Sequence, residues 1–218
     1  LAQWFWSVTL GELYGSSTES RLARDVPELV DWIGGAGARP RSLDEAVFQG
    51  VRLRSLRLRL SAAYKGIHAL LMKRGCRDFI SGRQTDVMTF FNDRIDIHHV
   101  FPRKWCEDAK LPREKWNSVV NKAPLAAETN RSIGGDAPTH YLKRIETSKK
   151  VAAVELDGFL ATHCIPVAAL RADNFQTFIQ HRAAALLGLI EVATGKTVAG
   201  RDSEETIEAF GASLAAQA

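Results

Sequence analysis

Two stretches of the chain decide the fold, and they read Asp96-Ile-His98-His99-Val-Phe-Pro102 and Asn121-Lys-Ala-Pro-Leu-Ala-Ala-Glu-Thr-Asn130-Arg131. Pro102 has no backbone N–H, so a strand cannot continue through it. We therefore predict a strand over 94–100 that ends just beyond the two histidines. The second stretch predicts a strand over 123–127 that leads into a helix bearing Asn130. Together they predict a small two-stranded hairpin packed on that helix.

The spacing of these residues resembles the HNH (ββα-metal) endonuclease motif. That motif has a metal ligand and a histidine before x-x-Pro, then an asparagine, then a histidine or asparagine nine residues later. The resemblance implies that His99 is the general base, that Asn121 steadies it, and that His98 and Asn130 hold a metal ion. Arg131 after Asn130 matches the form found in HNH domains of RNA-guided nucleases. One position departs from the motif, because the first ligand is usually aspartate and is His98 here.

These residue types suit phosphodiester hydrolysis, which needs a nucleophilic water, a base for its proton and a cation for the developing charge. A neutral imidazole is available near neutral pH because its ordinary pKa is about 6.5. We expect one divalent ion, Mg²⁺ or Mn²⁺, although an imidazole ligand also suits Ni²⁺ or Zn²⁺. Asp96 shares a strand face with His98. It is either a further ligand or a hydrogen-bond partner that fixes an imidazole tautomer.

The flanking segments extend the resemblance over nearly the whole chain. They are the opening Trp4-Phe-Trp6…Tyr14-Gly-Ser-Ser-Thr-Glu, the segment Arg77-Asp78-Phe79, and the ending Phe178…Arg182…Gly195-Lys196. They resemble the C-terminal part of GmrSD-type proteins, bacterial phage-defence enzymes that include SspE-type effectors. Such proteins join an N-terminal ParB-like nucleotidase domain to a C-terminal HNH nuclease domain. The resemblance implies an antiviral restriction endonuclease that nicks double-stranded phage or modified DNA, with the ParB-like domain in the same polypeptide.

Composition is that of a soluble globular protein, with 45% hydrophobic and 25% charged residues among 218. No apolar run reaches the roughly 20 residues of a membrane helix, and no signal peptide is visible. The three cysteines are widely spaced and lack a C-x-x-C pair, which argues against a zinc knuckle or a disulfide framework. We therefore expect a cytoplasmic protein without a membrane partner. The start at Leu1 suggests a fragment of a longer protein.

The net charge of +4 is unevenly distributed. Residues 50–83 hold nine Lys and Arg residues against Asp78 alone, so this block carries +8. Such a block suits a phosphate backbone, although a solvated helix face would have the same composition. We expect DNA contacts from Arg52, Arg54, Arg57, Arg59, Arg103, Lys104 and Arg131.

The remaining pattern predicts a mainly helical α+β protein, in which apolar spacing and stop signals set the helices. We predict one amphipathic helix over 55–74 ended by Gly75, although the alternation over 51–60 also permits a strand there. A short helix is predicted to open with a capping box at Ser42-Leu-Asp-Glu45. Further helices are expected over 17–33, 112–120, 138–150, 151–163, 174–194 and 202–216. The layout is a helical support with the basic helix over 1–85, the HNH core over 86–148, and C-terminal helices over 149–218, in one compact domain.

Two other functions remain compatible with these residues. A non-catalytic DNA-binding or regulatory module with a degenerate HNH site would explain His98 in place of aspartate together with the arginine-rich block. An all-helical protein-interaction domain would require the motif spacing to be accidental.

Overall fold

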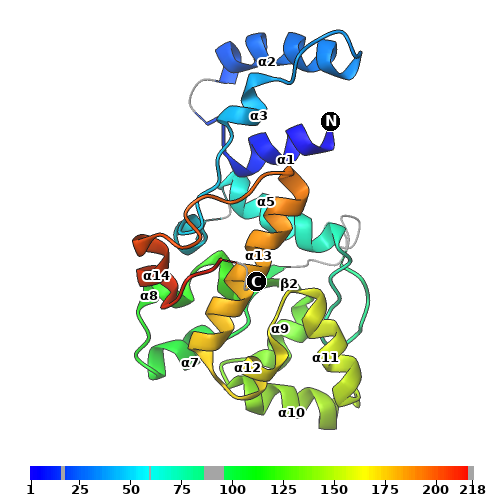
Figure 1. Cartoon of the computed structure of the whole chain (residues 1–218). Helices are drawn as coiled ribbons and strands as arrows, with labels where there is room; N and C mark the ends of the chain where they lie inside the picture. The colour runs from blue at the N-terminus through cyan, green and yellow to red at the C-terminus, as the bar shows by residue number, and fades with distance from the viewer. Residues whose placement is uncertain (16–17, 59, 86–95, 216–218) are drawn as a thin grey trace.

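A single long helix, α13 (Phe175–Thr194), runs through the middle of the molecule, and the other elements are arranged around it (Figure 1). The computed structural model describes residues 1–15, 18–58, 60–85 and 96–215. Apolar side chains on α13 recur every three or four positions, so one continuous stripe faces the core. Gly195 adopts a left-handed conformation with φ of 62° and ends the helix, as its sequence position predicted.

The other helices among the described residues are shorter than α13. They are α1 (Ala2–Leu10), α2 (Thr18–Ile33), α3 (Arg41–Glu45), α4 (Arg52–Ser55), α5 (Ala62–Lys73), α7 (Arg103–Asp108), α8 (Arg113–Trp116), the 3₁₀ turn η1 (Val119–Asn121), α9 (Ala127–Ile133), α10 (Pro138–Ser148), α11 (Ala153–Thr162), α12 (Val167–Arg171) and α14 (Glu204–Phe210). With the two strands described next, they make a mainly helical α+β fold, which confirms the predicted fold class.

The predicted hairpin is present. Strand β1 (Asp96–His99) pairs in antiparallel fashion with β2 (Lys122–Leu125), and Ala127 opens α9 two residues later. Residues 94 and 95 of the predicted first strand lie outside the described part of the chain. The N–H of Val100 donates to the carbonyl of Asn121 at 2.9 Å, which continues the pairing to the point where Pro102 ends it.

Core packing joins distant parts of the chain around α13. Helices α1, α5 and α12 and the turn η1 all contact it. An aromatic cluster of Phe101, Phe175 and Phe178 joins the end of β1 to the start of α13, with ring centroids about 5 Å apart between Phe101 and each partner. The three cysteines are buried and form no disulfide, in agreement with their spacing.

The prediction of one helix over 55–74 was wrong. The chain forms α4 and α5 instead, and residues 56–58 after α4 are not helical. The carbonyl of Leu56 accepts from the N–H of Val119 at 2.8 Å, so a tertiary contact takes this group out of a helical ladder. The Ser61 hydroxyl accepts from the N–H of Tyr64 and caps α5. Gly75, with φ of 84°, follows the end of α5 as predicted.

The capping box predicted at Ser42 was also wrong. Helix α3 begins one residue earlier, at Arg41, and Pro40 occupies its N-cap position. The Ser42 hydroxyl instead accepts from the indole N–H of Trp4 at 2.8 Å. The helix predicted over 112–120 is divided into α8 and η1, and helices α1, α7 and α12 were not predicted.

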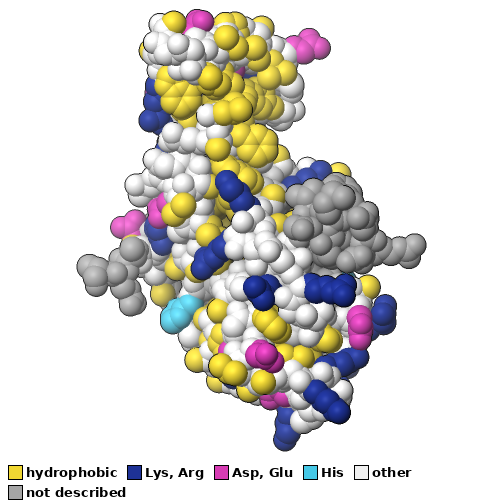
Figure 2. Space-filling view, turned by 90° about the vertical axis from the view of Figure 1, so that its right-hand side faces the viewer, with side chains coloured by type: hydrophobic (Ala, Val, Ile, Leu, Met, Phe, Trp, Pro, Cys, Tyr) yellow, Lys and Arg dark blue, Asp and Glu magenta, His cyan; other side chains and the backbone are white. Residues whose placement is uncertain are grey.

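The N-terminal arm, which we define as α2 and α3, stands apart from α13 at one end of the molecule (Figure 1). Only Asp25 and Leu29 of α2 are buried. One stripe of the helix faces solvent, with 40–62% of each side chain exposed, at Leu22, Val26, Val30 and Ile33. Figure 2 shows hydrophobic side chains gathered over this end of the molecule.

Candidate functional site

The fold brings the two halves of the motif together. His98 and His99 are neighbours on β1 and pair with Ala123 and Lys122 of β2. Successive strand residues point to opposite faces, so the two imidazoles face different surroundings. Asn130 lies in the first turns of α9, which follows β2 directly. All three side chains are partly exposed.

His99 lies against the end of α8. The Trp116 ring meets the imidazole edge-on, with ring centroids 5.4 Å apart and an interplanar angle of 69°. The Nε2 atom of His99 lies 3.2 Å from Oδ1 of Asn117. Burial, together with the nearby Lys122 ammonium, lowers the pKa of His99 from 6.5 to about 4. The ring is therefore neutral at neutral pH, the form that can accept a proton.

Asn121 is fully buried, and its side chain bonds the backbone. Its amide group donates to the carbonyls of Phe101 and Trp116 at 2.9 and 3.0 Å, and its oxygen accepts from the N–H of Phe101 at 2.8 Å. These bonds join the segment that leaves β1 to the end of α8. The contact with His99 comes from Asn117, a residue that sequence reasoning missed because its partner is distant in the sequence.

Arg182 of α13 clamps the second half of the motif from behind. Its guanidinium is fully buried and donates to the carbonyls of Val120 at 2.7 Å, Lys122 at 2.9 Å and His163 at 3.2 Å. Two of these carbonyls flank Asn121. Burial lowers the pKa of Arg182 to about 10, so the group stays charged at neutral pH. A charged residue in the apolar stripe of α13 was the signal in the sequence that could have identified it.

Two further buried groups position the hairpin and α9. Asp78 accepts from the N–H of Ala126 at 3.0 Å and from the Thr129 hydroxyl at 2.8 Å, so it anchors the start of α9. Burial alone would raise the pKa of Asp78, but the hydrogen bonds that its carboxylate accepts lower it overall. The Tyr141 hydroxyl of α10 donates to the carbonyl of Val100 at 3.0 Å.

The basic segment after α4 lies next to this site. The Lys122 ammonium donates to the carbonyl of Arg57 at 3.1 Å and lies over the Tyr64 ring. Arg57 is exposed, and Arg54 lies 3.7 Å from Glu114 of α8. Arg52 is instead engaged in an ion pair with Glu12, and Arg59 lies outside the described residues.

The other predicted DNA contacts lie on α7 and α9. Arg103 pairs with Glu107 at 2.7 Å and Lys104 with Asp108 at 2.6 Å, both one turn apart on α7. These carboxylates offset part of the positive charge. Arg131 on α9 is exposed. Figure 2 shows Lys and Arg side chains distributed over the lower part of one face of the molecule.

The donor set at the hairpin suits an ion that keeps most of its ligands as oxygen. His98 offers an imidazole nitrogen and Asn130 an amide oxygen, and their partial exposure leaves room for water. Within the described residues, no group of three or more His, Cys, Asp and Glu side chains converges as a metal site. Asp96 pairs with Leu125 through its backbone, and its side chain lies outside the described part.

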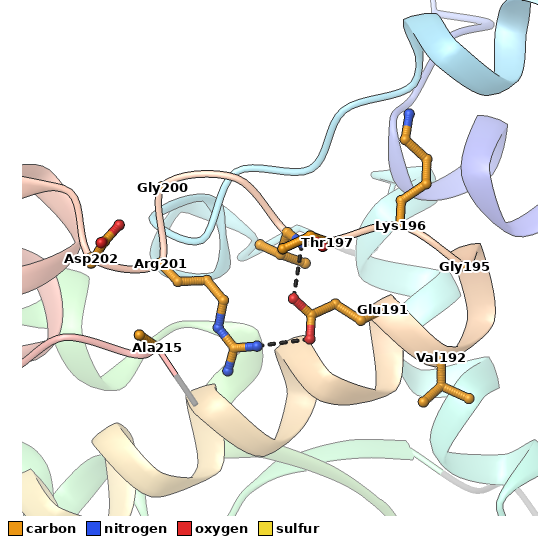
Figure 3. Close-up of a pocket in the computed structure, with 10 residues that line it drawn as sticks. Glu191, Val192, Gly195, Lys196, Thr197, Gly200, Arg201, Asp202 and Ala215 are labelled. Atoms are coloured by element: carbon orange, nitrogen blue, oxygen red, sulfur yellow. Dashed lines mark hydrogen bonds and ion pairs between the residues drawn. The ribbon is translucent and has the colours of Figure 1, made fainter. Parts of the chain in front are cut away.

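A pocket of about 680 Å³ lies elsewhere, at the C-terminal end of α13 and the loop that leads to α14 (Figure 3). Glu191 points toward Arg201 there and binds it at 2.8 Å. Glu191 also accepts from the N–H of Val198, while the Lys196 ammonium donates to the carbonyl of Leu43. These polar groups hold the loop against the helix, so we assign them a structural role.

A comparison with curated proteins finds one relative of this chain. It is 29% identical over 147 residues to Uncharacterized protein MJ0686 of Methanocaldococcus jannaschii. The match covers 66% of this chain and 24% of that protein, so the chain spans about a quarter of the relative's length. No family model and no solved structure matches the chain. No helix within the described residues is both long and apolar enough to cross a membrane.

Proposed function

We propose that this chain is a metal-dependent DNA endonuclease domain of the HNH type, which nicks double-stranded DNA. One observation carries the proposal: residues 23 to 29 positions apart in sequence form an antiparallel hairpin that leads directly into a helix, with His98 and His99 on the first strand and Asn130 on the helix. This is the arrangement that the motif resemblance requires. The basic segment around Arg57 beside the hairpin adds a surface for a phosphate backbone.

Each side chain has a part in this proposal. His99, neutral and held by Asn117, takes the proton from the attacking water. His98 and Asn130 would hold the divalent ion, Mg²⁺ or Mn²⁺ before Ni²⁺ or Zn²⁺. The ion, when bound, would stabilise the negative charge that develops on the phosphate. Asn121 and Arg182 hold the backbone on which these residues are mounted.

The wider setting is part of the same proposal. The resemblance of the flanks to GmrSD-type proteins supports a C-terminal nuclease domain of a bacterial phage-defence protein. Its substrate would be phage or modified DNA, and its partner a ParB-like nucleotidase domain in the same polypeptide. The longer relative is compatible with such an arrangement.

Relaxation of supercoiled plasmid over a panel of Mg²⁺, Mn²⁺, Ni²⁺ and Zn²⁺ tests the activity. We expect nicked circles from the wild type and at least a ~10²-fold loss of rate in His99→Ala. The exposed His140, on α10, supplies the control His140→Ala, which should retain the wild-type rate. Absence of cleavage with every ion, in this chain and in a longer protein containing it, would refute the endonuclease.

A second candidate is a DNA-binding module without catalysis. It is favoured by His98 at the position where the motif usually has aspartate. Binding to duplex DNA that weakens with salt, is unchanged in His99→Ala and is never followed by cleavage would favour this module.

A further inference from the structure

We propose that Asn117 is a positioning residue that holds the His99 imidazole in one tautomer and leaves Nδ1 to accept the proton of water. This role has meaning only if the proposed nuclease function holds. The motif resemblance does not assign Asn117 any part. The role of Asn117 is inferred from its contact with His99, which lies 18 positions away in sequence.

The tautomer that we propose follows from the amide atom of Asn117 that faces the ring. Nε2 of His99 lies 3.2 Å from Oδ1 of Asn117. An amide oxygen can only accept a hydrogen bond, so Nε2 must carry the hydrogen. A neutral imidazole has one N–H, and the other ring nitrogen then keeps its lone pair. Nδ1 of His99 is therefore the nitrogen that can act as a base.

Asn117 is itself held in place by its neighbours. It follows the last residue of α8, and its N–H donates to the carbonyl of Arg113 at 2.9 Å. Asn121 donates to the carbonyl of Trp116, the peptide group that joins Trp116 to Asn117. The Trp116 ring meets His99 edge-on. Asn121 thus steadies His99 through this peptide, and Asn117 makes the direct contact.

The location of Asn117 permits a clean test. Its side chain is partly exposed, whereas Asn121 is fully buried in a network of three bonds. Asn117→Leu keeps the size of the side chain and removes the acceptor. Asn117→Asp keeps the shape and can only accept, so it should preserve the Nε2–H tautomer. Both variants should melt close to the wild type.

Nitrogen NMR of histidine-labelled protein at about pH 8, where an ordinary imidazole is neutral, reads the tautomer directly. His99→Gln identifies the His99 signals by their loss. We expect protonated Nε2 and unprotonated Nδ1 in the wild type and in Asn117→Asp, and a mixture of tautomers in Asn117→Leu. Protonated Nδ1 in the wild type, or an unchanged spectrum in Asn117→Leu, would overturn the assignment.

Cleavage kinetics supply the second readout. In Asn117→Leu we expect kcat to fall by about 10–100-fold, with the KM for plasmid and the Mn²⁺ affinity unchanged. Asn117→Asp should rescue most of this loss. Equal losses in both variants would contradict a role through the tautomer. If the wild type fails to cleave with every ion tested, the proposed endonuclease and the catalytic role of Asn117 both fail. The nitrogen spectrum still decides the tautomer separately.

Discussion

The hairpin region and the N-terminal arm are each held together by a different kind of contact. At the hairpin, the buried side chains of Asn121 and Arg182 bond the backbone on which the histidines are mounted. In the arm, the contacts between α2 and α3 are ion pairs at the surface, in which Arg21 and Arg24 both bind Glu45. Exposed pairs of this kind contribute about 0–1 kcal/mol.

This difference indicates where the fold needs precision. A catalytic site has to keep its groups within about 0.5 Å of a working geometry, and buried, fully bonded supports achieve this. The arm carries an exposed apolar stripe and few buried residues, which is typical of a region of low local stability. Rigidity is thus concentrated behind His99 and not at the end of the molecule that α2 occupies.

Among the variants considered, loss of the Arg182 guanidinium should lower the free energy of unfolding most. Arg182→Met leaves three buried carbonyls without their donor, at Val120, Lys122 and His163. Hydrogen bonds to charged groups contribute about 1.5–3 kcal/mol each, and relief of the buried charge offsets part of the loss. We expect the free energy of unfolding to fall by about 3 kcal/mol or more in urea denaturation.

The exposed Arg131 of α9 supplies the matched control for that substitution. Arg131→Met should change the free energy of unfolding by less than about 0.5 kcal/mol. Similar losses in the two variants would mean that the buried guanidinium is not a clamp.

The second largest effect should be a loss of folding stability in acid, through the buried His163 that lies behind the hairpin. Burial lowers the pKa of His163 from 6.5 to about 4, and its Nδ1 atom is buried without a hydrogen-bond partner among the described residues. Between pH 6.5 and 4 the unfolded chain binds a proton at this position and the folded chain does not. Stability therefore falls as the pH drops through this window, by on the order of 3 kcal/mol at its lower end.

The variant His163→Gln tests this assignment, because its amide can still donate to the carbonyl of Arg77. Denaturation at a series of pH values should give a shallower slope than the wild type between pH 6.5 and 4. An unchanged slope would assign the acid sensitivity to other groups.

The sequence predicted those features that depend on residues close together along the chain, and it failed where the partner is distant. The strand end at Pro102, the helix that carries Asn130 and the stop at Gly195 depend on neighbours in sequence, and the patterns predicted them. The helix over 55–74 failed because Val119, more than 60 residues away, takes the carbonyl of Leu56. Local periodicity carries no information about such a partner.

The candidate site was predictable to the same extent. Motif spacing led us to propose His98, His99, Asn121 and Asn130, and the fold brings their segments together. It gave no sign of Asn117 and Asp78, because they act through partners distant in sequence. For Arg182, the charge in the apolar stripe of α13 was a sign of an unusual residue, but not of the carbonyls that it binds. Their contribution is a matter of tertiary packing, which a single sequence does not encode in any local pattern.

The smallest expected effect compares one valine in each region. Val120 is fully buried behind the site, whereas 62% of Val30 in α2 is exposed. Val120→Ala should lower the free energy of unfolding by roughly 2 kcal/mol, from about 0.8 kcal/mol per buried methylene and a small cavity. Val30→Ala should stay within about 0.5 kcal/mol of the wild type. A large loss at Val30 would show that the arm is packed more firmly than its exposure indicates.

Calorimetric titration of Mn²⁺ into the wild type, His98→Ala and His99→Ala tests the division of labour between the two histidines most directly. Because neighbouring residues of β1 face opposite ways, the imidazoles should not share one function. We predict that His99→Ala keeps metal binding close to the wild type and that His98→Ala weakens it strongly. Binding lost in His99→Ala and kept in His98→Ala would reverse the two roles, and absence of Mn²⁺ binding in the wild type would contradict the metal site itself.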